Sequence, residues 1–227
     1  MKKDTKSYRI LIVESNEKVL ISLKKLLLKR IVDPIIINAV DFKSAKMLFS
    51  QEDYDVILLD LNLSDRKGQQ LLDDFGKENF SKTILLAELQ DSELTRYAIS
   101  KGVSDYLEKS ELSSRLLYKS IVYSIERRKN IAKLQESEKR FSNLFYLNPQ
   151  PMYVFDFKTL QFLRVNDAML KQYGYSIAEF LDMTLLDIRP KNQISAFKKA
   201  FKYLESYDRL VPADEYQHQK KNGETFY

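Results

Sequence analysis

Cysteine is absent from the 227-residue sequence, and histidine occurs once, as His218. Without cysteine the chain has no disulfide, no thiolate metal site and no cysteine nucleophile, which suits a reducing compartment such as the cytoplasm. No phosphate-binding loop and no dinucleotide fingerprint occur either. With one histidine and no ATP-binding module, the chain is not expected to work as a histidine kinase.

Long hydrophobic runs are also missing. No segment approaches the roughly 18 apolar residues that predict a membrane span, and no apolar segment follows the N-terminal lysines, so neither a membrane anchor nor a signal peptide is expected. The net charge is +5, but basic residues are scattered among acidic ones, which is typical of a solvated surface rather than a nucleic-acid interface. With 44% apolar and 30% charged residues, the sequence predicts one large soluble domain or two smaller ones.

The first half of the chain alternates short apolar runs with helical patterns. The stretch Glu17–Arg30, for example, carries leucines at helical spacing. Strands that alternate with helices predict an α/β fold with a parallel sheet and right-handed crossovers. The expected strands are Tyr8–Val13, Ile35–Ile37, Val56–Leu59, Thr83–Ala87 and Val103–Leu107, and the other expected helices lie near Ala45–Phe49, Gln69–Phe75 and Ser92–Ser100.

Polar residues follow several of these strands. Glu14 and Ser15 follow the first strand and Asp60 follows the third. Lys109 follows the fifth strand, whereas the fourth ends in Ala87. The carboxyl ends of parallel strands meet at one edge of a sheet, where open α/β folds bind ligands. Two carboxylates and a lysine at that edge predict a site for a hard cation and a phosphoryl group.

Three motifs occur in order: ILIVES at residues 10–15, DVILLDLNLSDRKG at residues 55–68 and SELTRYAISKGVSDYLEK at residues 92–109. With their spacing, they make residues 8–125 resemble the receiver domain of bacterial response regulators. The resemblance implies a flavodoxin-like, doubly wound, five-stranded parallel sheet. It also implies a cytoplasmic protein of two-component phosphorelay signalling. No helix-turn-helix pattern follows, so transcription-factor output is not expected.

The resemblance implies a role for each residue at the sheet edge. Asp60 would accept a phosphoryl group from a histidine kinase or phosphotransfer protein, and Lys109 would contact that group. Glu14, Asp60 and the backbone carbonyl of Asn62 would hold Mg2+. Tyr106 would be the aromatic side chain that changes rotamer on activation. Beyond self-catalysed phosphotransfer and dephosphorylation, no enzymatic activity is expected.

Two positions depart from the receiver pattern. Receivers usually have a second acid after the first strand, where this chain has Ser15, and a neutral hydroxyl is a weaker Mg2+ ligand than a carboxylate. Receivers usually end the fourth strand in Thr or Ser, where this chain has Ala87, so the switch lacks a hydroxyl. Two interpretations stay open: a receiver that is phosphorylated at Asp60, and a degenerate receiver that acts as a phosphorylation-independent interaction or dimerisation module.

An enzyme of the haloacid-dehalogenase type also uses an aspartate nucleophile at a strand end, and the stretch 60–64 is similar to its motif. The general acid of that motif is an aspartate, and Asn62 stands in its place. An amide cannot donate and recover a proton at neutral pH. The enzyme interpretation is therefore disfavoured.

Neither proline nor glycine occurs in residues 111–147, which predicts a linking helix that continues from the receiver. Ile131, Leu134, Phe141 and Phe145 lie near heptad spacing, interrupted by a glutamate. A heptad-like seam with so few apolar residues would stabilise a coiled coil only weakly. The helix is therefore either a solvated connector or a dimerisation helix.

The last third contains RFSNLFYLNPQPMYVFD, FLRVNDAMLKQYGYSIAEF and KKNGETFY. These stretches make residues 140–227 resemble a PAS domain, which implies an α+β domain with an antiparallel sheet. The resemblance stops inside a hairpin, so this PAS-like domain is expected to be truncated at its C-terminus. The expected elements are strands at Met152–Phe155 and Phe162–Val165, a helix from Asn166 to Gly174, and a polar strand near Glu215–Gln219.

No ligand of the PAS-like domain can be assigned. The absence of cysteine excludes cysteinyl-flavin photochemistry, and His218 is interpreted as a surface residue because it lies on a strand candidate rather than a long helix. A homodimer through the linking helix or the PAS-like region is left open. The aromatic residues expected in the core are Tyr153, Phe155, Phe157, Phe162 and Phe201.

Overall fold

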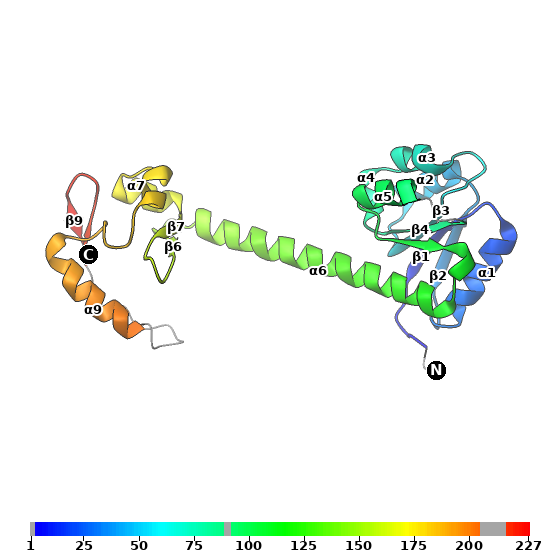
Figure 1. The fold of residues 1–227 in the computed structure, drawn as a ribbon, viewed down its shortest axis with the longest axis horizontal. Helices are drawn as coiled ribbons and strands as arrows, with labels where there is room; N and C mark the ends of the chain where they lie inside the picture. The colour runs from blue at the N-terminus through cyan, green and yellow to red at the C-terminus, as the bar shows by residue number, and fades with distance from the viewer. Residues whose placement is uncertain (1–2, 89–91, 205–216) are drawn as a thin grey trace. The chain divides into compact units, whose positions relative to one another are not determined.

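The computed structural model describes residues 3–88, 92–204 and 217–227 (Figure 1). The chain divides into two compact units, Met1–Leu134 and Gln135–Tyr227. Among the described helices, none has the length and apolar character needed to cross a membrane.

The first unit contains a five-stranded sheet in the order β2-β1-β3-β4-β5, and every neighbouring pair is parallel. This confirms the predicted parallel α/β fold. The sheet lies within the right-hand body of Figure 1. Its strands are β1 (Arg9–Val13), β2 (Ile35–Ala39), β3 (Val56–Asp60), β4 (Thr83–Ala87) and β5 (Asp105–Glu108).

Both faces of this sheet are covered, which explains why its central strands are continuous apolar runs. On β3, Val56 and Leu58 pack into one apolar cluster, and Ile57 and Leu59 pack into the other. Successive residues of a strand point to opposite faces, so each face receives every second side chain. One face is covered by α1 (Glu17–Leu28) and the first part of α6 (Ser114–Tyr146), and the other by α2 (Phe42–Gln51), α3 (Gly68–Asp74), α4 (Lys77–Phe80) and α5 (Ser92–Ser100).

Several element boundaries in this unit differ from the prediction by one to three residues, and the starts of the fifth strand and of the linking helix have a visible structural cause. The fifth strand begins at Asp105, because the N–H of Val103 bonds back to the carbonyl of Ala98 and closes the end of α5. The linking helix begins at Ser114 rather than at residue 111, because the short 3-10 helix η1 (Lys109–Glu111) precedes it. The sequence also did not predict α4, which follows Gly76 at φ +87°.

Helix α6 is continuous from Ser114 to Tyr146, as predicted apart from its ends. Three residues of the heptad-like seam are exposed: Ile131 at 47%, Leu134 at 62% and Phe141 at 46%. Phe145 is 2% exposed and belongs to the second unit. The seam is therefore not a uniformly buried stripe.

Within its described residues, 135–204 and 217–227, the second unit has two separate two-stranded antiparallel sheets, β6-β7 and β8-β9. The single larger antiparallel sheet implied by the PAS resemblance is not observed among its described residues. Of the candidate strand Glu215–Gln219, His218 and Gln219 form β8, and residues 215–216 lie outside the described part of the chain. The elements are β6 (Tyr153–Phe155), β7 (Phe162–Val165), α7 (Asp167–Tyr173), α8 (Ile177–Asp182), η2 (Lys191–Gln193), α9 (Ile194–Leu204), β8 (His218–Gln219) and β9 (Thr225–Phe226).

A buried amide organises the start of this unit. Asn166 is fully buried, and its side-chain oxygen accepts hydrogen bonds from the N–H groups of Met152 and Met169. Its side-chain nitrogen donates to the carbonyls of Phe145 and Gln150, among others. One side chain thus caps α7 and satisfies backbone groups at the end of α6 and before β6. The predicted helix stop is also confirmed, because Gly174 has the left-handed conformation at φ +78°.

The surface interpretation of His218 is wrong. Its ring is partly buried, and its Nδ1 is hydrogen-bonded to the Tyr173 hydroxyl. Burial, together with the positive charge of Arg189, lowers the pKa of His218 to about 4. The expected aromatic core is confirmed except at Phe157, which is 43% exposed.

Candidate functional site

The candidate site lies at the carboxyl edge of the receiver-like sheet, where Asp60 ends β3. Asp60 is 2% exposed, and Glu14, which follows the adjacent strand β1, is 1% exposed. Lys109 follows β5, two strands away from β3. Its side chain must therefore extend past the end of β4 to reach Asp60.

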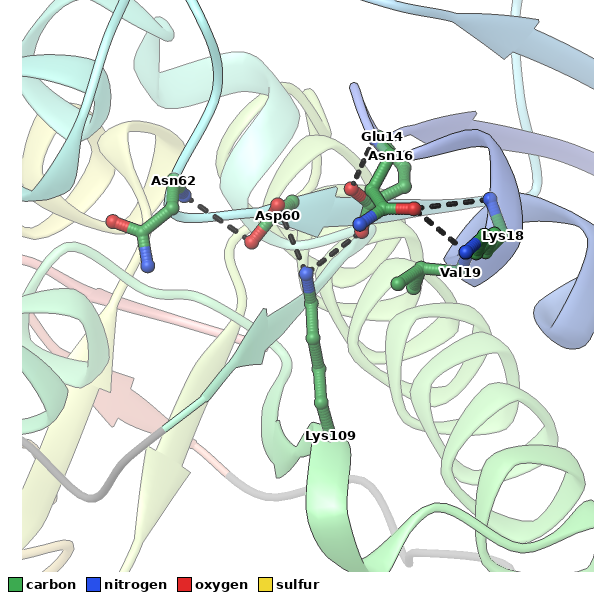
Figure 2. A network of polar contacts seen from close by, with 7 residues as sticks. All are labelled: Glu14, Asn16, Lys18, Val19, Asp60, Asn62 and Lys109. Atoms are coloured by element: carbon green, nitrogen blue, oxygen red, sulfur yellow. Dashed lines mark hydrogen bonds and ion pairs between the residues drawn. The ribbon is translucent and has the colours of Figure 1, made fainter.

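Lys109 bridges the two carboxylates (Figure 2). Its ammonium nitrogen lies 2.8 Å from Glu14 Oε2 and 2.9 Å from Asp60 Oδ2. The lysine side chain is only 11% exposed, so all three charges are largely withdrawn from water. A buried charge is stable only when a group of opposite charge pairs with it. The ion pair between Lys109 and Glu14 joins residues that are 95 positions apart in the sequence.

Backbone amides hold the remaining carboxylate oxygens. The N–H of Asn62 donates to Asp60 Oδ1 at 3.2 Å, and the N–H of Asn16 donates to Glu14 Oε1 at 2.8 Å. The Asn16 side chain in turn accepts from the N–H groups of Lys18 and Val19 and caps α1. Sequence reasoning missed Asn16, although an Asn just before an amphipathic helix is an N-cap signal.

Burial and the contacts within the site shift the pKa values of Glu14 and Lys109. Burial raises the pKa of Glu14, and the neighbouring Asp60 charge acts in the same direction, against the hydrogen bonds from Lys109 and the Asn16 amide. Burial by itself lowers the pKa of Lys109, but the hydrogen bonds to Glu14 and Asp60 outweigh it, so that pKa is raised. We therefore assign Lys109 as a charged ammonium.

The oxygen atoms at this edge of the sheet match the ligand preferences of Mg2+ only in part. Two carboxylates at one edge suit Mg2+, which takes one or two carboxylates and keeps several water ligands. Ser15 is exposed, and it makes no hydrogen bond to Glu14, Asp60 or Lys109 among the described residues. Among those same residues, no group of three or more His, Cys, Asp or Glu side chains is placed to hold a metal ion. A cation at this edge would compete with the Lys109 ammonium.

The two proposed switch residues share one face of the sheet. Ala87 ends β4 and is 5% exposed, and Tyr106 lies on β5, in register with Leu85. Ala87 and Leu85 are in the core cluster against which the partly buried Tyr106 packs. The structure thus places Tyr106 on the same face of the sheet as Ala87.

Residues 10–121 match the family model of the response regulator receiver domain. Among solved structures, NtrX from Brucella abortus superposes with a TM-score of 0.53 at 20% identity, covering 60% of this chain and 31% of that protein. The receiver domain of a putative LuxO repressor protein from Vibrio parahaemolyticus has a TM-score of 0.50 at 23% identity, covering 57% of this chain and 98% of that domain. At these identities the likeness supports the fold alone. No curated protein sequence matches the chain.

The fold and the site define an open parallel α/β domain with a buried acidic group at the carboxyl edge of its sheet. Residues 10–121 are a response regulator receiver domain, which is the domain of two-component signalling that interacts with histidine kinases or phosphotransfer proteins. The family match ends at residue 121, so the PAS interpretation of the second unit stays a prediction.

Proposed function

We propose that Asp60 accepts a phosphoryl group from a histidine kinase or phosphotransfer protein. The observation that carries this proposal is the Lys109 ammonium, 2.9 Å from Asp60 Oδ2 in a buried site. An Asp60 oxygen forms a bond to phosphorus while the bond between phosphorus and the donor histidine nitrogen breaks, and that nitrogen keeps the electron pair. Lys109 offsets the charge of the transferred group by a charge-assisted hydrogen bond.

Mg2+ would be held by Glu14, Asp60 and the backbone carbonyl of Asn62, with the Ser15 hydroxyl as a weak additional ligand. Its contribution would be to neutralise charge on the phosphoryl oxygens. With two carboxylates and one lysine, the site has a formal charge of −1, which a second acid in place of Ser15 would make −2. Weak Mg2+ binding is the expected consequence.

Intact mass spectrometry after treatment with acetyl phosphate and Mg2+ tests the proposal. The chain should gain the mass of one phosphoryl group, and Asp60→Asn should not. Asp65→Asn is a matched control, because Asp65 is exposed and its carboxylate accepts the N–H groups of Phe42 and Lys43 rather than contacting Lys109. Absence of the adduct in the unaltered chain would favour the second candidate, a degenerate receiver that acts as an interaction module, for which the missing hydroxyl at Ala87 is the supporting observation.

We further propose that α6 passes the state of the receiver to the C-terminal unit, which acts as a PAS-like sensor or interaction domain in the cytoplasm. The support is the unbroken helix from Ser114 to Tyr146. Lys133→Pro should cost about 3 kcal/mol of helix stability and uncouple the units. If hydrogen exchange in the C-terminal unit responds to phosphorylation equally with and without this proline, the helix is only a tether.

A further inference from the structure

The exposed apolar side chains of the receiver gather at one edge of its sheet. Among the described residues between 3 and 125, eight large hydrophobic side chains are exposed. A group of such side chains on one surface is typical of an interaction site, whereas single ones need no explanation. Five of the eight lie on α1, on the edge strand β2 or next to it: Ile21 at 45%, Leu28 at 47%, Val32 at 53%, Ile35 at 47% and Val40 at 54%.

One flank of α1 lies over β2. The ammonium of Lys24 donates a hydrogen bond to Asn38 Oδ1 on β2 at 3.1 Å. Residues three or four apart share a helix face, so Ile21 and Leu28 lie on the same flank as Lys24. The buried leucines of α1 point into the core. Ile21 and Leu28 therefore line the open side of β2.

The backbone of β2 is open on that side. In the described part of the chain, β1 is the one strand that pairs with β2. The N–H of Ile35 donates to the carbonyl of Tyr8. Alternate residues of a parallel pair bond to the same neighbour, so Ile36 and Asn38 direct their N–H and C=O groups away from β1. Such an edge is a template for a further strand.

We propose that β2 pairs with β2 of a second copy of the chain in an antiparallel arrangement, with the two-fold axis at Ile37. A two-fold contact is self-complementary. Ile36 of each copy lies opposite Asn38 of the other, and each such pair exchanges both of its hydrogen bonds. The open N–H and C=O groups of both residues are thereby satisfied. Ile37 packs against Ile37 of the other copy, where antiparallel side chains come closest.

The flank of α1 favours a second copy as the occupant of this edge. Ile21 and Leu28 are seven residues apart, about 10.5 Å along the helix. The antiparallel arrangement places Ile21 of each copy against Leu28 of the other. A single extended peptide would satisfy the backbone of β2 but would bring no helix of its own to cover these two side chains. A second copy supplies both the strand and the matching apolar flank.

Charge gives this dimer a characteristic salt dependence. Lys24 of each copy is held by Asn38, next to the two-fold axis, and the register places Asp33 opposite Asp41. Like charges across an interface repel each other, and salt screens that repulsion. The dimer should therefore tighten as NaCl is raised from about 0.05 to about 0.5 M. A dimer held together by ion pairs would weaken instead.

Sedimentation equilibrium of the full 227-residue chain tests the backbone pairing. Asn38 is exposed, and Asn38→Pro removes an N–H that faces away from β1, so the bonds between β1 and β2 are kept. This variant should weaken the dimer by at least about tenfold. Asn38→Ala is the matched control, because it keeps the N–H and should dimerise as the unaltered chain does.

A second variant tests the apolar flank without touching the strand. Leu28→Lys places a cation against Ile21 of the other copy and should also weaken the dimer by at least about tenfold. Leu28 is already 47% exposed, so the fold should tolerate the change. The matched control is Ile99→Lys on α5, where the replaced side chain is 61% exposed; it should leave the dimer unchanged.

Crosslinking with a short thiol-specific reagent then fixes the direction, because the chain has no cysteine of its own. A mixture of Ile21→Cys and Leu28→Cys chains should crosslink to each other, and Leu28→Cys should not crosslink to itself. Four results would each overturn the proposal: a monomer at every concentration, which would leave the edge to an extended segment of another protein; a dimer that Asn38→Pro leaves unchanged; a dimer that weakens with salt; or a Leu28→Cys homodimer crosslink.

Discussion

Replacing Lys109 by methionine should destabilise the receiver domain strongly. The side chain keeps its length but loses the ammonium that lies 2.8 Å from Glu14 and 2.9 Å from Asp60. The two carboxylates, 1% and 3% exposed, are left unpaired and beside each other. Removing one partner of a buried ion pair typically costs about 3–5 kcal/mol, and we expect a loss of that order in metal-free buffer near neutral pH.

Lys82→Met is the matched control. Lys82 is 2.8 Å from Asp53, the same distance as in the Lys109–Glu14 pair, but the Asp53 side chain is 92% exposed. A pair open to water contributes about 0–1 kcal/mol. Hydrogen exchange of the β3 amides measures the free energy of opening in the receiver unit by itself. Equal losses in Lys109→Met and Lys82→Met would show that burial of the site is not the source of the effect.

The loss of stability that Lys109→Met causes in the receiver domain should become smaller as the pH falls. The pKa of Glu14 is already raised by burial, and without Lys109 it should rise further. A carboxyl group whose folded pKa is raised costs stability as pH rises from its unfolded value through its folded value. Comparison of the variant at about pH 8 and about pH 5 should therefore show partial recovery at the lower pH. A pH-independent loss would refute the assignment of two buried charges.

Three further predictions concern single positions. Ser15→Asp should tighten Mg2+ binding, since it adds a third carboxylate at the sheet edge, and isothermal titration that finds equal affinities would contradict this. Ala87→Thr should increase the change in the NMR signals of Tyr106 on addition of beryllofluoride, because a hydrogen bond to a charged group contributes about 1.5–3 kcal/mol; a large response in the unaltered chain that Ala87→Thr leaves the same would contradict it. The second unit should lose stability as pH falls from 6.5 toward 4, because the pKa of His218 is lowered in the folded state. The loss should stay below about 3 kcal/mol, since the ring is partly exposed to solvent, and His218→Gln should abolish it in urea titrations at several pH values.

The five strands of the receiver, and the polar residues that follow them, could be predicted from local sequence patterns. The unbroken apolar run Val56–Leu59 predicts a strand, because a strand buried on both faces needs such a run. Asp60 and Lys109 could be placed at one edge because parallel strands all end on the same side of the sheet. Helix α6 followed from the absence of proline and glycine over more than thirty residues. Each of these predictions rests on a local sequence pattern, such as an apolar run or the absence of helix-breaking residues within one strand or helix.

Which of those residues contact each other depends on how the strands are ordered in the folded sheet. That Lys109 bridges Glu14 and Asp60 depends on the strand order β1-β3-β4-β5 and on a lysine side chain long enough to pass the end of β4. His218 is interpreted from the sequence as a surface residue because it lies on a strand candidate rather than on a long helix, yet its ring is hydrogen-bonded to the hydroxyl of Tyr173, 45 residues earlier. Asn166 likewise satisfies the backbone of Phe145 and Gln150 through a side chain whose partners no sequence pattern specifies. Local sequence sets backbone preferences, whereas a buried polar group is stable only where the packed chain supplies its partner.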